Sequence, residues 1–243
     1  MGGLFSGVIA RITLRATLGR KRALIFAIAP LLLILLTLLL KAARPPGAPW
    51  PARVLGDFGF SVILPLIALV IGTSVLGAEI DDGSIVHLLA TPVRRSTVIV
   101  TKFCVGAALT AAFVAVPELI AGLIAEGRAD SLTIGLFVGA LVGSAIYNAV
   151  FVMLSVLTTR AIAVGLLYVL IWEAVLGNFV GGARLLSVEQ YALGVANSIA
   201  HDAALRAGLT LATAVVLGVI VTVAALAVAT RRLAGFSLKG DAV

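Results

Sequence analysis

Long apolar stretches recur along the whole chain, and they restrict what it can fold into more than any other feature. A helix needs about 20 predominantly apolar residues to cross the hydrocarbon core of a bilayer. Of the 243 residues, 61% are hydrophobic and 12% are charged, and the mean hydropathy is +1.19, which is outside the range of soluble domains. The pattern predicts one all-α integral membrane domain over residues 1–243, with six transmembrane helices. The predicted spans are about 23–40, 58–77, 98–125, 132–157, 161–180 and 206–229.

Residues 3–20 predict a helix of a different kind. Apolar residues recur there at helical spacing, and Arg11 and Arg15 stand four residues apart. This pattern predicts an N-terminal amphipathic helix in the membrane interface, with a frayed basic tail as the alternative. The next run, 23–40, is longer than the apolar core of a cleavable signal peptide, so we interpret it as a retained first span.

The basic residues indicate the orientation of the chain. Six spans place both termini on one side, and twelve of the 18 Lys and Arg residues fall on that side. The positive-inside rule therefore predicts that both termini are cytoplasmic. The net charge of +7 does not indicate a nucleic-acid partner, because the basic residues stand at segment ends, where they contact anionic membrane lipids. Short loops and an Ala- and Gly-rich composition favour the inner membrane of a bacterium as the location of this multi-pass protein.

The connections differ in character. Four prolines in 41–57 predict an irregular loop, and Pro117 predicts a break in the third span. The connection 181–205 is longer than the others and mildly amphipathic, and we expect no span there.

The sequence lacks the catalytic or ligand residues that several enzyme classes require. The two histidines, His87 and His201, lie outside the predicted spans, so a zinc or serine protease within the membrane has no ligands or base. Gly122 and Gly127 have the spacing of a phosphate-binding loop, but the Lys and the Ser or Thr that hold phosphate and magnesium are missing. We therefore expect no catalytic residue, no metal and no cofactor in this chain, and we interpret its one cysteine, Cys104, as a small buried apolar residue.

A polar segment, 78–97, connects the second and third predicted spans. It holds an acidic patch, a glycine, a leucine pair, a proline and two arginines. Asp82 or Ser84 can cap a short helix there, and Pro92 would end it. Such a cytoplasmic helix can dock into a cleft of a soluble partner, and an ordinary loop is the alternative. The candidate docking residues are Glu79, Asp82, Gly83, Leu88, Leu89, Pro92 and Arg95.

This order of residues, with Lys102 on the next span, resembles the signature of type-2 ATP-binding-cassette (ABC) permeases. Ile171-Trp172-Glu173 resembles the family less specifically. The resemblance implies a permease that pairs with a second copy or a related permease, with spans one and five favoured for the pairing. It also implies two separate cytoplasmic ABC ATPase subunits that bind ATP and Mg²⁺, and a coupling helix at 79–92.

Polar residues within spans are the candidates for the substrate path, since they are costly in a bilayer and often functional. Glu118 follows Pro117, Glu173 lies in the fifth span and Asn148 lies in the middle of the fourth. The alternative for each is a hydrogen bond between helices. Gly135, Gly139 and Gly143 share one face of the fourth span, where they indicate close packing within the monomer or, alternatively, a dimer face.

These observations favour the membrane subunit of an ABC exporter for an amphipathic or cationic compound. A secondary transporter or channel that works without ATP is the alternative. A membrane scaffold or immunity protein that sequesters a ligand is a third interpretation.

Overall fold

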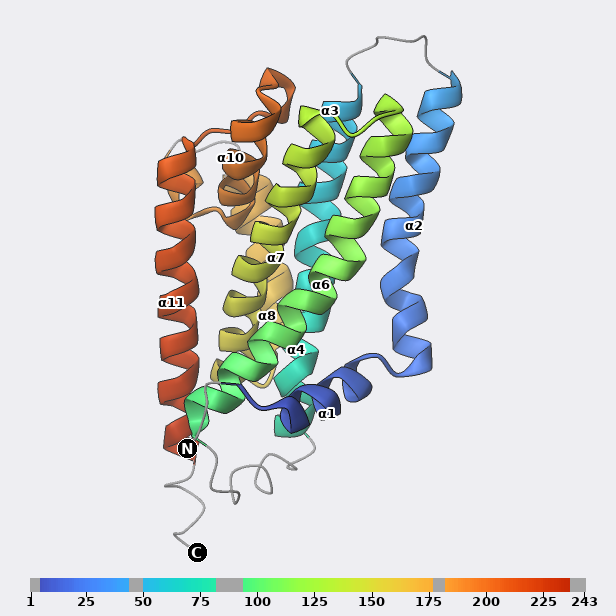
Figure 1. Cartoon of the computed structure of the whole chain (residues 1–243). Coiled ribbons are helices and arrows are strands. Elements are labelled where there is room, and N and C mark those ends of the chain that lie inside the picture. The colour runs from blue at the N-terminus through green and yellow to red at the C-terminus, as the bar shows by residue number, and fades with distance from the viewer. Residues whose placement is uncertain (1–4, 44–49, 82–93, 177–181, 237–243) are drawn as a thin grey trace, which may run out of the picture.

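The structure, a computed structural model, describes residues 5–43, 50–81, 94–176 and 182–236. Every regular element in these ranges is helical, and most of the helices run side by side as a bundle (Figure 1). The described chain begins and ends at the same end of this bundle. The all-α membrane fold that the hydropathy pattern predicts is confirmed at this level.

The long helices agree with the predicted spans to within a few residues in most places. The first predicted span is α2, and the second is a continuous run of α3, the π-helix η1 and α4. The remaining spans correspond to α6, to α7, to α8 with the π-helix η2, and to α11. Their bounds are Arg20–Ala43 for α2, Pro51–Val54 for α3, Leu55–Ile63 for η1, Leu64–Asp81 for α4, Arg95–Glu126 for α6, Ser131–Leu157 for α7, Ala161–Leu167 for α8, Tyr168–Leu176 for η2 and Leu211–Phe236 for α11.

Five of these segments are long and apolar enough to cross a membrane: Phe26–Ala43, Pro51–Gly77, Arg95–Glu126, Ser131–Leu157 and Leu211–Gly235. The fifth predicted span, 161–180, qualifies only as a shorter apolar helix over Ala161–Glu173, so the count of six is not confirmed. Residues 177–181, at the end of that predicted span, lie outside the described part.

Two expectations that rest on prolines are wrong. Helix α3 already begins at Pro51, because proline at the first helical position loses no hydrogen bond there. Helix α6 runs unbroken past Pro117, since its packing between α2, α4 and α7 holds the helix despite the lost backbone bond. The connection 181–205, predicted to be long and mildly amphipathic, contains the buried helix α10, Val188–Ala200, between the short helices η3, Ala183–Leu186, and η4, Ala203–Leu205.

Helix α7 is the centre of the bundle and packs against α4, α6, α10 and α11. Its glycines let α10 approach closely. A Cβ atom at Gly135 would lie 2.5 Å from the Ala196 carbonyl oxygen, and one at Gly139 would lie 2.7 Å from that of Ala192. The glycine face therefore packs within the monomer.

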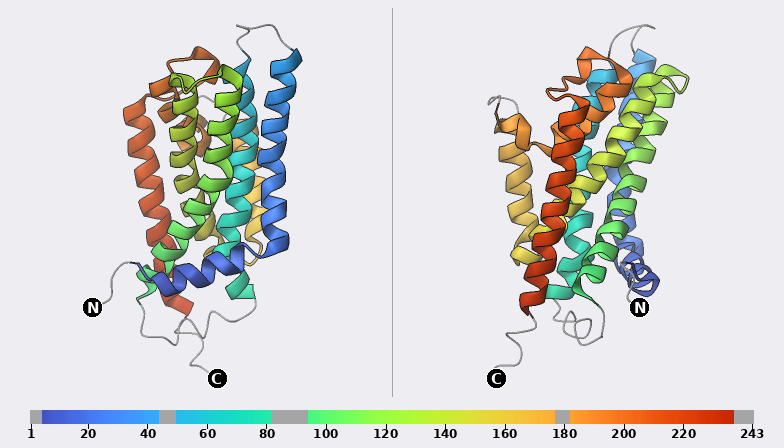
Figure 2. Two further views of the ribbon diagram at one scale, coloured as in Figure 1. Left: turned by 45° about the vertical axis from the view of Figure 1, so that its right-hand side comes forward. Right: turned by 60° about the vertical axis from the view of Figure 1, so that its left-hand side comes forward.

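Helix α1, Gly7–Thr17, precedes α2 and crosses the end of the bundle where the chain begins and ends (Figure 2). It buries Ile9, Thr13 and Thr17, whereas Val8 and Ile12 are exposed. The helix begins and ends within the predicted range 3–20. Only part of the predicted apolar stripe faces the protein.

Candidate coupling and transport residues

The predicted coupling segment connects α4 to α6, at the end of the bundle where the described chain begins and ends (Figure 1). Its two ends are described: Glu79 lies in the last turn of α4, and Arg95 is the first residue of α6. The predicted residues Asp82, Gly83, Leu88, Leu89 and Pro92 lie outside the described residues.

Glu79 and Lys102 join the two helices on either side of this segment. The Lys102 ammonium donates to Glu79 Oε1 at 2.6 Å and to the backbone carbonyl oxygen of Val75 at 2.6 Å. Val75 and Glu79 are four residues apart, so both acceptors lie on the face of α4 that meets α6. The Lys102 side chain is fully buried and that of Glu79 is 26% exposed. A buried ammonium is tolerated here because a carboxylate and a carbonyl oxygen replace its water.

Glu173 binds the N-terminus of α10. Its carboxylate accepts from the Tyr168 hydroxyl at 2.8 Å, the Ser187 hydroxyl at 2.5 Å and the Val188 backbone N–H at 2.9 Å. Ser187 is the N-cap residue of α10, and its hydroxyl also accepts from the Gln190 N–H. A negative charge at this position complements the helix dipole. These contacts have the geometry of the alternative interpretation of Glu173, a hydrogen bond between helices.

Asn148 lies where α4, α6 and α7 meet. Its amide donates to the Thr110 hydroxyl at 2.7 Å and to the Ser144 carbonyl oxygen at 2.8 Å. Two glycines make room for it, because a Cβ atom would lie 2.6 Å from Asn148 Oδ1 at Gly106 and 3.2 Å at Gly72. The residue is fully buried and connects helices.

Glu118 differs from the other two candidates. It is fully buried, and neither carboxyl oxygen has a hydrogen-bond partner in the described part of the chain. Its Oε1 atom lies against the backbone of η1, where a Cβ atom at Gly59 would be only 1.5 Å away. π-Helical turns occur often at functional sites, and η1 supplies one beside this carboxyl group.

Sequence reasoning missed Glu189. The Ser61 hydroxyl of η1 donates to Glu189 Oε1 at 2.5 Å, and this pair links η1 to α10. The pKa of Glu189 is raised to about 7 in total, because burial raises it, the Ser61 hydrogen bond lowers it, and the nearby carboxylates Glu173 and Asp57 raise it. The sequence does carry a signal for α10: Ser187-Val-Glu-Gln190 has the Ser-x-x-Gln spacing of a helix start.

No group of three or more His, Cys, Asp or Glu side chains is placed to hold a metal ion among the described residues. His201 is exposed and ends α10 in a left-handed conformation, with φ of 53°.

A bundle of long apolar helices with polar residues buried between them defines a multi-pass membrane protein. Residues 18–182 match the family described as ABC-2 family transporter protein. The match covers more than half of the sequence, so the chain belongs to this family and is a permease component of an ABC transporter. This confirms the resemblance seen in the sequence, and membership implies association with an ABC ATPase. No curated protein matches the chain.

Proposed function

We propose that this chain is the permease subunit of an ABC exporter, driven by ATP that two separate cytoplasmic ATPase subunits hydrolyse. The observation that carries the proposal is the Glu79–Lys102 ion pair at the foot of α4 and α6. It joins the two helices that the coupling segment connects, at the end where both termini lie. ATP and Mg²⁺ bind to the ATPases in this scheme, and this chain binds no cofactor of its own.

The ion pair suggests how movement passes from the ATPase into the membrane. If the segment 82–93 shifts with the ATPase, α4 and α6 are displaced together, because the buried Lys102 holds them at one point. Both helices pack on α7, so the displacement reaches the centre of the bundle. Glu79 acts here as a positioning residue, and the docking contacts belong to Gly83, Leu88 and Leu89.

Among the three candidates for the substrate path, we assign the role in substrate contact or gating to Glu118. The carboxylate of Glu173 already accepts from three donors, and the Asn148 amide already donates to Thr110 of α6 and to the Ser144 carbonyl oxygen of its own helix. The carboxyl group of Glu118 has no partner in the described residues, so it is free to meet a cationic group or a proton when α6 and η1 separate. A mostly apolar bundle with one such carboxyl group suits an amphipathic, cationic substrate.

We place the protein in the inner membrane of a bacterium, with both termini in the cytoplasm. The basic residues concentrate on the side of the termini, as the positive-inside rule requires. In this arrangement α8 and η2 form the sixth crossing.

The first experiment is an affinity pull-down of the chain from membranes in mild detergent, with mass spectrometry of the proteins that co-purify. We expect an ABC ATPase subunit to co-purify with the wild type and to be lost with Gly83→Trp and Leu88→Asp. Charge reversal by Glu79→Lys is not a clean test of docking, because it would also place two ammonium groups together at Lys102. The double variant Glu79→Gln with Lys102→Met therefore serves as the control for helix packing, and we expect it to retain the ATPase.

Transport in proteoliposomes then separates the proposal from an ATP-independent transporter. We expect uptake of a cationic amphipathic dye into inside-out vesicles only with ATP and the partner ATPase. Uptake that follows an ion gradient and ignores ATP would contradict the proposal and favour a secondary transporter. A stable lone oligomer without any ATPase would also count against it.

A further inference from the structure

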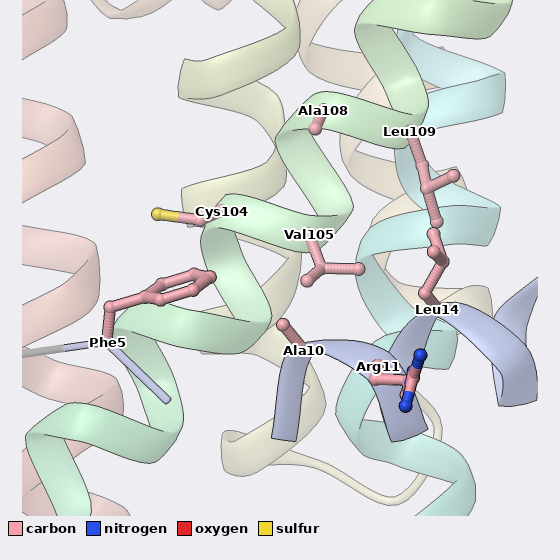
Figure 3. A pocket seen from close by; sticks show the side chains of 8 residues that line it. All are labelled: Phe5, Ala10, Arg11, Leu14, Cys104, Val105, Ala108 and Leu109. Carbon is pink, nitrogen blue, oxygen red and sulfur yellow. The ribbon is translucent and has the colours of Figure 1, made fainter. Parts of the chain in front are cut away.

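An apolar groove lies between α1 and α6 near the end of the bundle where the chain begins and ends (Figure 3). Its volume is about 460 Å³, within the usual range of about 300–1,000 Å³ for small-molecule sites. Phe5 and Leu14 line it from the side of α1, and Val105 and Leu109 line it from α6. In Figure 3 the Leu14 and Leu109 side chains point toward one another.

The groove has fixed walls. The backbone N–H of Ser6 donates to the Thr101 hydroxyl of α6 at 3.1 Å, which fixes the start of α1. Ile9, Thr13 and Thr17 are buried along the face that α1 turns to the protein. These contacts hold α1 against the bundle, so the groove between α1 and α6 is a fixed feature of the fold.

The mouth of the groove carries positive charge. Arg11 lines the groove, and Arg15 follows one turn later; both are exposed. Neither arginine has an ion-pair partner among the described residues. An apolar slot with a guanidinium group at its mouth complements a molecule with an acyl chain and an anionic headgroup.

We propose that this groove binds one anionic phospholipid, with its phosphate on Arg11 and an acyl chain against Val105 and Leu109. A bound lipid fills the space between α1 and α6 and thereby stabilises α1 on the bundle. This site does not depend on the direction of transport or on the ATPase.

Cys104 supplies a direct test, because it is the one cysteine of the chain and it lines the groove. The purified full-length protein is placed in nanodiscs of phosphatidylcholine alone or with phosphatidylglycerol, and the rate of N-ethylmaleimide labelling is measured. We expect phosphatidylglycerol to slow the labelling, and Arg11→Gln to reduce this protection about fivefold. The matched control is Arg128→Gln, an exposed arginine at the other end of the bundle, which should change nothing.

A second pair of variants tests the slot itself. Ala108 lines the groove, so Ala108→Trp should fill it and abolish retention of phosphatidylglycerol in native mass spectrometry. Ala112→Trp, on an exposed position one turn further along α6 and outside the lining, should retain the lipid. Equal protection of Cys104 by both lipids, or full protection in Arg11→Gln, would overturn the proposal. Retention of phosphatidylglycerol by Ala108→Trp, with a thermal midpoint equal to that of the wild type, would also overturn it.

Discussion

At the scale of single residues, a side chain at Gly59 would meet the carboxyl group of Glu118. A methyl group there would lie 1.5 Å from Glu118 Oε1, so the end of the Glu118 side chain, η1 or α6 must move. We expect Gly59→Ala to lower the free energy of unfolding by about 1–3 kcal/mol, as overpacking does elsewhere. Thermal unfolding in detergent measures the loss.

Two variants decide whether the close contact with Glu118 is the cause. Glu118→Ala removes the carboxyl group, so the double variant with Gly59→Ala should regain most of the lost stability. Gly235→Ala is the control, because nothing lies within 4 Å of its Cβ position. A Gly59→Ala protein as stable as the wild type would contradict the contact.

Glu189 makes stability depend on pH. Its pKa in the folded protein is about 7, against an ordinary value of 4.5, chiefly because it is buried. The folded state therefore holds the proton more tightly than the unfolded state does. Stability from this group is complete below about pH 4.5, falls as the pH rises to about 7 and is constant above that, with a total change of at most about 3 kcal/mol.

Thermal midpoints between pH 4.5 and 8 measure this effect for the wild type and for Glu189→Gln. We expect the difference between them to change across that window, because the glutamine does not titrate. Glu126→Gln, the same change at a half-exposed carboxylate, should follow the wild type. Parallel curves for the wild type and Glu189→Gln would refute the assigned proton.

At the scale of elements, α10 depends on a side chain from a neighbouring helix. The Glu173 carboxylate accepts from Ser187 and Val188 at the start of α10 and from Tyr168 of its own helix, and glutamine presents an amide N–H₂ to some of these donors. We expect Glu173→Gln to speed amide hydrogen exchange in Val188–Ala200 by about tenfold or more, since an unmet buried hydrogen bond costs about 1–3 kcal/mol. Tyr168→Phe removes a single donor and should have a smaller effect. Unchanged exchange in Glu173→Gln would show that α10 is held by its packing alone.

The sequence predicts these elements unequally, and α10 shows why. The bilayer sets the length of a span, so hydropathy alone placed α6 and α7 within a few residues of their bounds. Helix α10 is 13 residues long and buried against the glycine face of α7, so its pattern is not that of a span. The predictions from prolines were wrong in two places, because Pro51 starts a helix and Pro117 lies within one.

In the candidate site, too, some features follow from the sequence and others only from the packing of the helices. The order of Glu79 and Lys102 in the chain was recognisable, but their contact depends on how α4 packs on α6. The hydrogen bond between Ser61 and Glu189 joins residues 128 positions apart, and no local pattern indicates it. Residues with local partners are therefore predictable from sequence, whereas buried polar pairs between distant helices require the fold.

At the scale of the whole molecule, the outer face of α2 is incompletely explained by the monomer. Only 22% of the apolar stretch Phe26–Ala43 is buried, and Leu31 and Leu35 are 62% and 52% exposed. On α8, Ile162 and Leu167 are 58% and 56% exposed. Lipid can cover such faces, but the resemblance to type-2 ABC permeases favours these two spans for pairing with a second copy.

Cross-linking of single cysteines distinguishes a dimer face from a lipid face. In a Cys104→Ala background, Leu35→Cys and Leu167→Cys are introduced one at a time and oxidised in native membranes. Because a two-fold axis brings equivalent residues together, we expect a disulfide-linked dimer from at least one of them.

Val219→Cys and Val223→Cys on α11 are the matched controls, since these side chains are 56% and 61% exposed. Helix α11 is as open as α2, because only 17% of its most apolar stretch is buried. Dimers formed through α11 alone would assign the interface to the opposite face, and equal cross-linking at every position would indicate random collision in the membrane. A dimer through α2 or α8 would support pairing of two copies of this chain in the transporter.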